Sequence, residues 1–73
     1  MPVTIICKGR PSWPREVTIE VQPGWTIADT LREANITSKR HGIMSIVNGR
    51  LCRLSTPVQP DDVITIFPRM GGG

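Results

Sequence analysis

The sequence predicts an α+β domain in which one helix packs across a mixed sheet of four to five strands. Three observations support this: an alternating segment near the start, one segment with helical apolar periodicity, and three β-rich apolar segments after it. The chain has 73 residues, which is enough for one domain with a small core. A core of this size leaves no room for a deep cleft with a full catalytic apparatus, so a carrier, a subunit or a binding module is favoured over an enzyme.

The first part of the chain predicts two strands joined as a hairpin. Residues 3–7 are apolar and mostly β-branched, and residues 16–21 alternate between polar and apolar side chains. In the second segment Val17, Ile19 and Val21 share one side, as expected for a half-buried strand. A long loop with one glycine and two prolines connects the two strands.

A short helix is predicted over roughly residues 26–35. Thr26 is a favourable N-cap, and Asp29 three residues later completes a pattern close to a capping box. Trp25 precedes the cap, where it could act as a hydrophobic staple, and Trp13 lies in the hairpin loop; both are expected to pack against the domain. The apolar stripe of the helix consists of Ile27, Leu31 and Ala34.

Three further strands are predicted at residues 43–47, 51–54 and 63–67. Asn48-Gly49, between the first two, is the strongest two-residue hairpin signal because both residues tolerate positive φ. The resulting order is β-β-α-β-β-β, and the strongly apolar first and last strands are expected to be central. A helix that crosses the sheet between the second and third strands gives the ubiquitin-like, or β-grasp, arrangement.

Composition argues against several functional classes. Cys7 and Cys52 form no C-x-x-C pair and have no histidine-rich surroundings, so two reduced thiols are expected rather than a zinc site, with a disulfide as the less favoured alternative. No apolar run approaches the ~20 residues of a membrane helix, and no signal peptide is evident, which predicts a cytoplasmic protein that does not enter membranes. The net charge of +3 is spread along the chain without a dense basic patch, which argues against nucleic-acid binding.

The three glycines at the end of the sequence are the feature that most suggests a function. A glycine tail has no side chains to pack, and glycine loses more backbone entropy on ordering than any other residue. We therefore expect residues 1–68 to form the domain and residues 69–73 to form a flexible Gly-rich tail that leaves it after the rigid Pro68. Such a slim arm, with Gly71 and Gly72 behind Gly73, can thread a narrow channel and deliver the Gly73 carboxylate to another protein's active site.

The Gly73 carboxylate needs activation before it can react, because a carboxylate is a poor electrophile at neutral pH. Transfer to the α-phosphate of ATP would give an acyl-adenylate, and a sulfur nucleophile could then displace AMP to leave a thiocarboxylate. The sequence contains no phosphate-binding loop and no catalytic or metal-binding constellation. We therefore expect no bound cofactor, no metal and no intrinsic catalytic residue, with ATP used by a separate enzyme.

The second half of the sequence resembles the MoaD/ThiS family of sulfur carriers. The similarity is carried by Val47-Asn48-Gly49-Arg50-Leu51, by Pro57, and by the run from Asp61-Asp62-Val63 through Ile66-Phe67-Pro68 to Gly72-Gly73. Two positions depart from the family pattern: Pro60-Asp61-Asp62 lacks the usual glycine of this turn, and Gly71 stands where a serine or threonine is common. Neither departure affects the last two glycines.

The resemblance implies roles for several residues and partners. Gly73 would carry the adenylate and then the sulfur, after activation by an E1-like adenylating enzyme of the ThiF/MoeB type. A sulfur donor such as a cysteine desulfurase and a sulfur-accepting synthase, in thiamine thiazole or molybdopterin synthesis, would be the other partners.

By the resemblance, Phe67 would be an exposed docking position. Alternation along the strands agrees, because Ile64 and Ile66 are expected in the core, which leaves Phe67 on the outer face together with Ile6. Arg69 could pair with an acidic groove on the partner. The alternatives are a second apolar layer for Phe67 and a solvated charge for Arg69.

Two other functions share these features. The chain could be a ubiquitin-like modifier joined through Gly73 to lysines of other proteins, which needs the same adenylated tail. It could also be a non-covalent β-grasp adaptor whose glycine end is a frayed terminus without function. The sequence leaves these alternatives open, and it does not identify the pathway that receives the sulfur.

Overall fold

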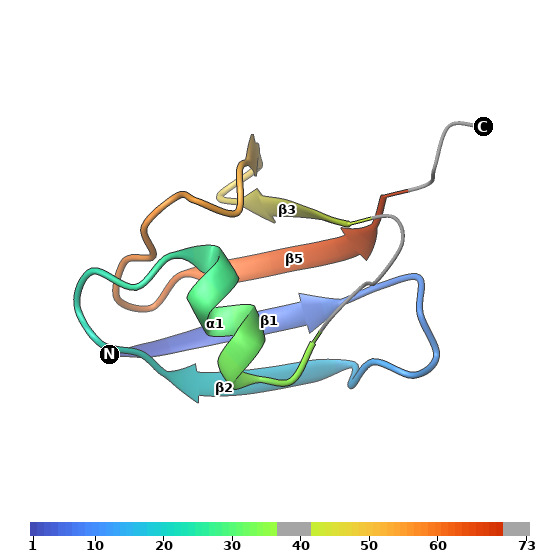
Figure 1. Ribbon diagram of the computed structural model, residues 1–73, viewed down its shortest axis with the longest axis horizontal. Coiled ribbons are helices and arrows are strands. Elements are labelled where there is room, and N and C mark those ends of the chain that lie inside the picture. The colour runs from blue at the N-terminus through green and yellow to red at the C-terminus, as the bar shows by residue number, and fades with distance from the viewer. Residues whose placement is uncertain (37–41, 70–73) are drawn as a thin grey trace.

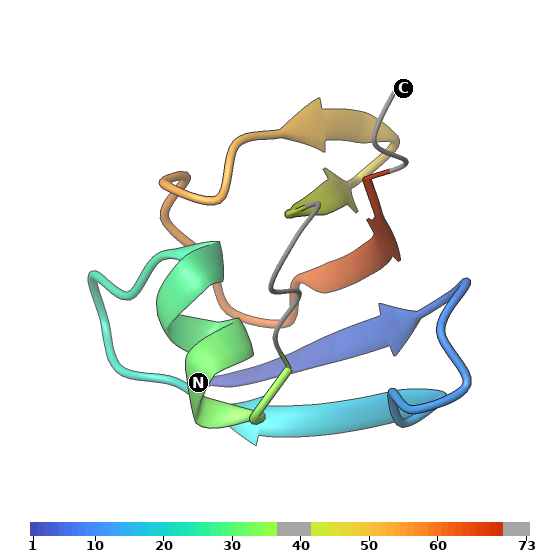
Figure 2. The ribbon, with the colours of Figure 1, turned by 45° about the vertical axis from the view of Figure 1, so that its right-hand side comes forward.

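The computed structural model describes residues 1–36 and 42–69. Over these residues the elements are β1 (Pro2–Cys7), β2 (Glu16–Glu20), α1 (Ile27–Glu33), β3 (Ile43–Val47), β4 (Arg50–Cys52) and β5 (Val63–Pro68). The five strands form one sheet, and α1 lies across one of its faces (Figures 1 and 2). The predicted α+β fold, with one helix on a mixed sheet, is therefore confirmed.

The strand order across the sheet is β2-β1-β5-β3-β4. β1 and β5 are parallel, and the other neighbouring pairs are antiparallel. The first and last strands are thus interior strands, as their apolar sequences predicted. In Figure 1 both point away from the N-terminus, so β5 carries the chain to the opposite end of the sheet.

The apolar core lies between α1 and the inner face of the sheet. Alternate residues of the two central strands supply its floor: Val3, Ile5, Ile64 and Ile66 are each at most 1% exposed. The helix and the connecting segments close the core from above. Their buried apolar residues, together with one from the end of the hairpin, are Val21, Ile27, Leu31, Ile36 and Val58.

The helix begins at the predicted cap and ends earlier than predicted. Thr26 Oγ1 accepts a hydrogen bond from the Asp29 N–H (3.2 Å), and the Thr26 N–H donates to Asp29 Oδ2 (2.9 Å), which completes a capping box. At the other end Ala34 is the C-cap and Asn35 enters the left-handed region with φ 58°. That residue ends the helix, because the left-handed conformation turns the chain away from the helical path.

β4 is shorter than predicted and begins one residue earlier, since it spans Arg50–Cys52 rather than residues 51–54. The residues after β4 form hydrogen bonds with the start of the helix instead of with β3. The Leu54 carbonyl accepts a hydrogen bond from the Ala28 N–H (2.9 Å), and the Thr56 carbonyl accepts one from the Ile27 N–H (2.9 Å). Both donors belong to the first turn of α1, where N–H groups have no partner within the helix. The chain therefore leaves β3 after Cys52 in order to satisfy the helix N-terminus.

The turns explain how the chain reverses at two sequence-predicted positions. Asn48 and Gly49 have φ values of 53° and 77°, which confirms the predicted two-residue hairpin. Asp61, in the turn that lacks the family's usual glycine, also has positive φ (65°). Aspartate tolerates this conformation better than most residues, so the turn keeps its shape without glycine.

Both tryptophans pack against the core, as predicted. Trp13 and Trp25 are half-buried and contact the core residues. The position that would complete a hydrophobic staple with Trp25 is occupied by Thr30, which is polar and fully buried. Trp25 therefore packs at the base of the helix without forming the predicted apolar pair across its first turn.

Candidate functional site

The predicted site begins where β5 leaves the sheet. The Lys8 N–H donates to the Ile66 carbonyl on one side of the strand (2.9 Å), and the Arg69 N–H donates to the Gly42 carbonyl on the other (3.2 Å). These bonds continue the ladders on both sides of β5 to its end. The main chain is therefore held through the amide of Arg69, one residue into the tail that the sequence predicted to begin at this position.

A close contact holds Pro68, the last residue of β5, against the loop between β1 and β2. Gly9 in that loop has φ 89°, and a Cβ atom built on it would lie 2.8 Å from Pro68 Cδ. Only glycine permits this backbone to approach the proline ring so closely. Sequence reasoning did not find Gly9, because a glycine two residues before a proline in a loop looks like an ordinary turn signal.

The predicted reactive end of the chain, Gly71, Gly72 and Gly73, lies outside the described residues. Its expected roles therefore stay predictions. The structure defines the point from which this segment starts, at the hydrogen-bonded Arg69. Four residues follow it in the sequence, and four fully extended residues span at most about 14 Å.

Phe67 lies on the sheet face opposite the helix, as predicted. Side chains alternate between the two faces along β5. Ile64 and Ile66 are fully buried and face α1, so Phe67 faces the other way. Phe67 is half-buried and pairs directly with Met44 of β3. Ile6 belongs to β1, pairs with Thr65 of β5 and lies on the same outer face. The predicted placement of Phe67 and Ile6 is thus confirmed, whereas their docking role stays a prediction.

The structure adds four residues to this surface that the sequence prediction missed. Leu51 is 67% exposed and Val63 is 45% exposed, which is unusual for large apolar side chains. The sequence of β3 could have indicated this surface. Its apolar residues fall on both faces of the strand, a pattern typical of a strand that is covered on both sides. We name this surface the outer-face patch; its residues are Ile6, Met44, Ile46, Leu51, Val63 and Phe67.

Arg69 is exposed beside the outer-face patch, at the start of the tail. It makes no ion pair with any residue in the described part of the chain, where the ion pairs join the N-terminus to Glu20 and Arg32 to Asp29. Its guanidinium is therefore available to a partner on geometric grounds.

The described residues include two free cysteines and no cluster that could bind a metal ion. Cys7 and Cys52 are free cysteines on the inner side of the sheet, where both pack against the core. Burial raises the pKa of the Cys7 thiol, which disfavours the nucleophilic thiolate at neutral pH. Within residues 1–36 and 42–69, no cluster of three or more His, Cys, Asp or Glu side chains could hold a metal ion, and no helix is long and apolar enough to span a membrane.

Comparisons with known proteins agree with the fold and indicate the family. A model of the ThiS family matches residues 8–73, and no individual curated protein matches the chain. The fold is similar to the crystal structure of SAMP1 from Haloferax volcanii, with a TM-score of 0.73 and 19% identity over 100% of both chains. A crystal structure of H. volcanii small archaeal modifier protein 1 gives a TM-score of 0.71 at 17% identity, covering 94% of this chain and 98% of that one. Because the family model matches nearly the whole chain, including the central strand β5 and the glycines that follow it, the chain belongs to the ThiS family.

Proposed function

We propose that this protein carries sulfur as a thiocarboxylate on Gly73. The observation that carries the proposal is the position of β5, which runs through the centre of the sheet, contributes Val63 and Phe67 to the outer-face patch and is followed two residues later by the glycines. A partner that docks on this face would then receive the end of the chain within the reach of the four residues that follow Arg69, at most about 14 Å. Membership of the ThiS family supports the same function.

The chemistry proceeds in two displacements at the end of the chain. A carboxylate oxygen of Gly73 attacks the α-phosphorus of ATP, pyrophosphate leaves, and a mixed anhydride with AMP forms. A sulfide equivalent then attacks the acyl carbon, and the carbon–oxygen bond to AMP breaks to leave a thiocarboxylate. The described part of the chain offers no phosphate-binding loop, so both steps require a separate adenylating enzyme of the E1-like class.

The outer-face patch is the proposed docking surface for that enzyme. Its apolar residues lie around Thr65, which pairs with Ile6 on one side and Ile46 on the other and has Val63 and Phe67 two residues away along β5. Two of them, Leu51 and Val63, are exposed, and exposed apolar surface is typical of interaction sites. Arg69 lies at its edge and would pair with a carboxylate of the enzyme. The later acceptor is proposed to be a synthase of thiamine thiazole or of molybdopterin, with a cysteine desulfurase as the source of sulfur.

Intact-mass spectrometry tests the proposal directly. The full chain is incubated with ATP, magnesium and an E1-like enzyme, then with a sulfide donor. The expected result is a mass gain of one adenylyl group, followed by a mass that corresponds to the exchange of one oxygen for sulfur. A chain extended by one alanine after Gly73 is the control, and it should not react, because a misplaced carboxylate by about 1 Å can cost on the order of a hundredfold in rate. Equal reaction of both chains, or of neither, would refute the proposal.

A second candidate function is protein modification through Gly73. The observation that favours it is the structural similarity to proteins described as small archaeal modifiers. At less than 20% sequence identity, this similarity concerns the fold alone. Both candidates need the adenylate and differ in the fate of the acyl group. A free thiocarboxylate identifies the carrier, whereas a ladder of lysine conjugates in cells identifies the modifier.

Phe67→Asp should abolish adenylation while leaving the domain folded. A carboxylate in the outer-face patch must be desolvated when a partner docks, whereas in the free domain water reaches it. Thr18→Asp, on an exposed position of β2, is the matched control and should be adenylated at the normal rate. Circular dichroism measures folding of both variants. Unfolding of the Phe67 variant would place its side chain in a second core layer and contradict the docking role.

A further inference from the structure

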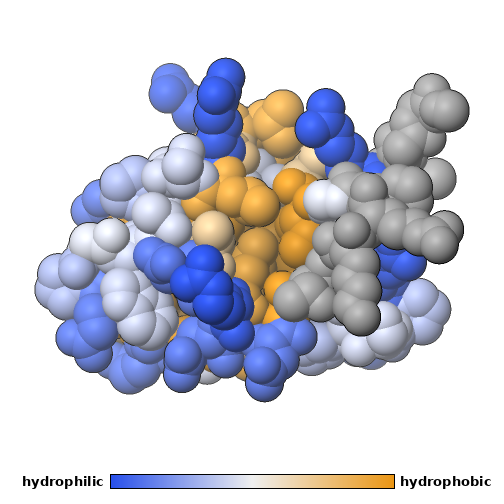
Figure 3. Space-filling model, in the orientation of Figure 1, coloured by the Kyte–Doolittle hydropathy of each residue, from blue (hydrophilic) through white to orange (hydrophobic). Residues whose placement is uncertain are grey.

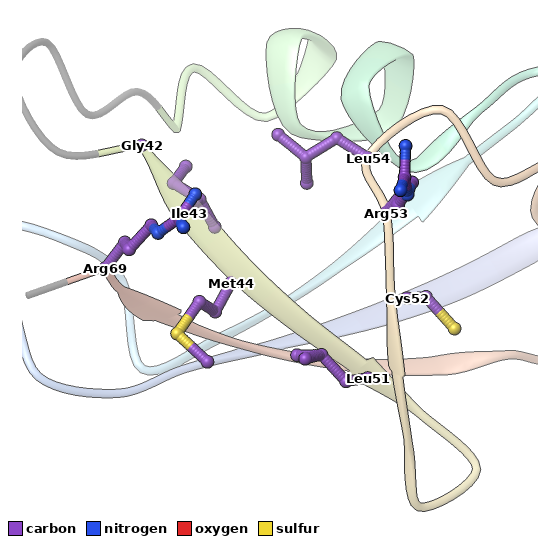
Figure 4. Close-up of a pocket in the computed structure, with 8 residues that line it drawn as sticks. All are labelled: Gly42, Ile43, Met44, Leu51, Cys52, Arg53, Leu54 and Arg69. Atoms are coloured by element: carbon purple, nitrogen blue, oxygen red, sulfur yellow. The ribbon is translucent and has the colours of Figure 1, made fainter.

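A groove opens beside the start of the tail, between β3 and the segment that follows β4. It lies between residues 42–44 and 51–54, with Arg69 at its edge, and its volume is about 690 Å³. We name it the β3–β4 groove. Leu54 points across it toward Ile43, while Arg53 and Arg69 project from its two sides (Figure 4).

The groove exists because the helix draws one of its walls away from the sheet. The β3–β4 ladder ends at the pair Ser45 and Cys52. Beyond this pair the Leu54 carbonyl bonds to the Ala28 N–H at the helix N-terminus rather than to β3. The first part of β3 therefore pairs with β5 along one edge. Along its other edge it has no ladder partner among the described residues.

Within residues 1–36 and 42–69, the edge of β3 that has no ladder partner comes down to one residue, Ile43. The Gly42 carbonyl accepts from the Arg69 N–H, so residues 42 and 44 direct their main-chain polar groups toward β5. Because these groups alternate along a strand, the N–H and C=O of Ile43 point into the groove. They form a ready donor and acceptor for one residue of an extended chain.

The walls of the groove determine the chemistry that it can accept. Apolar side chains of β3 and of the segment after β4 line the groove on its two sides. The groove continues into a hollow of about 240 Å³ between α1 and β3, because Ile43 and Leu54 line both spaces. Figure 3 shows this apolar hollow open on the helix face of the molecule. Both charged residues of the groove, Arg53 and Arg69, are exposed arginines, and none of its lining residues is acidic. Guanidinium groups bind carboxylates in bidentate geometry.

We propose that the β3–β4 groove binds an extended acidic segment of a partner protein. The segment's main chain pairs with Ile43, an apolar side chain enters the hollow beside α1, and carboxylates pair with Arg53 and Arg69. Met44 and Leu51 belong to both the groove and the outer-face patch, so a partner that covers the patch would place such a segment here. The interaction is independent of any reaction at Gly73.

The binding test uses the full 15N-labelled chain and a synthetic peptide, without ATP or enzyme. The probe is an amidated nonapeptide with alternating leucine and serine followed by four acidic residues, made in both orders. Amide chemical shifts should change at Gly42, Ile43 and Leu54, with a dissociation constant on the order of 0.1–1 mM. A peptide with lysine in place of every acidic residue should bind at least tenfold more weakly.

Charge variants with a matched control decide whether the groove is the site. Arg53→Glu should weaken binding about tenfold, because it replaces attraction by repulsion. Arg15→Glu makes the same charge change on an exposed residue outside the groove and should alter affinity by less than about twofold. Amide spectra of the free variants verify their folding.

Three outcomes would overturn the proposal. Shifts confined to Ile6, Val63 and Phe67 would place the peptide on the outer-face patch instead. Equal weakening by the Arg53 and Arg15 variants would show only general attraction to a basic protein. Tighter binding of a short single-stranded oligonucleotide at the same amides would make nucleic acid the occupant.

Discussion

The backbone of Asp61 adopts a conformation that most residues avoid. Its φ of 65° lies in the left-handed region, and its N–H donates to the Pro2 carbonyl (2.9 Å), which fixes the turn against the start of β1. Asp62 closes the same turn by accepting the Gln59 N–H on Oδ2 (2.8 Å). The turn before β5 thus depends on one residue's backbone tolerance and on its neighbour's carboxylate.

Asp61→Val should destabilise the domain by about 1–2 kcal/mol, because a β-branched side chain is strained at positive φ. Asp61→Gly should change the free energy of unfolding by less than about 0.5 kcal/mol, since relief of strain is offset by the greater entropy of glycine in the unfolded chain. Urea denaturation measures both. Gln59→Val, exposed in the same turn at negative φ, serves as the control. A valine at position 61 that leaves stability unchanged would contradict this account.

Two glycines with nearly equal backbone angles separate strain from contact. Gly9 and Gly24 have φ values of 89° and 91°, but only at Gly9 would a Cβ atom meet a neighbour, Pro68. Both alanine variants suffer the strain of positive φ, roughly 1 kcal/mol. Gly9→Ala should lose about 1 kcal/mol more and shift the amide signals of Gly42 and Arg69, which Gly24→Ala should not. Equal effects of the two substitutions would show that the loop does not hold the end of β5.

At the scale of elements, the capping box connects helix stability to pH. α1 has only 7 residues, so its start depends on the reciprocal bonds between Thr26 and Asp29. Thr26→Ala should cost about 1 kcal/mol, whereas Thr26→Ser, which retains the hydroxyl, should cost much less. Thermal and urea unfolding followed by circular dichroism provide the comparison. Equal losses from alanine and serine would indicate that the threonine methyl group, not the hydroxyl, stabilises this end.

Acidification should weaken the same cap through Asp29. The hydrogen bond from the Thr26 main-chain N–H is the largest influence on the pKa of this carboxyl and lowers it. Desolvation is the second and raises the pKa, and the Thr26 hydroxyl and Arg32 lower it, so the pKa lies below its ordinary value. A carboxyl with a lowered folded-state pKa stabilises the fold fully above its ordinary pKa of about 3.9, and this contribution is lost as pH falls through the folded value. The stability difference between the natural protein and Asp29→Asn should therefore shrink below about pH 4. A difference that stays constant from pH 7 to pH 2 would exclude this linkage.

At the scale of the whole molecule, the folded core and the proposed reactive end are separate. Every buried apolar residue lies between Val3 and Ile66 in the described chain, and glycines have no side chain to add to the core. Removing Gly72 and Gly73 should change the free energy of unfolding by less than about 0.5 kcal/mol, the usual range for changes away from the core. The truncated chain should nevertheless fail to form an adenylate. A truncated chain that keeps its biological activity would favour the adaptor alternative.

Local patterns in the sequence determined the elements and their faces. Alternation along residues 16–21 and 63–67 identified strands with one buried side, and it placed Phe67 away from the helix. Thr26 and Asp29 marked the helix start, and Asn48-Gly49 marked the hairpin. These predictions succeeded because strand period, capping and turn chemistry depend on residues that are close in the chain. Resemblance of the second half to known sulfur carriers then indicated the family that the comparison confirmed.

Only the tertiary structure decided how those elements meet. The end of β4 at Cys52 follows from the hydrogen bond between Leu54 and Ala28, which joins positions 26 residues apart. The contact of Gly9 with Pro68 joins the first loop to the last strand, and the register of β3 on β5 places Met44 beside Phe67. Each of these results from pairing between distant segments, which leaves no periodic trace in either one. The strands were therefore readable from the sequence, whereas the outer-face patch in full, the anchor of the tail and the β3–β4 groove required the fold.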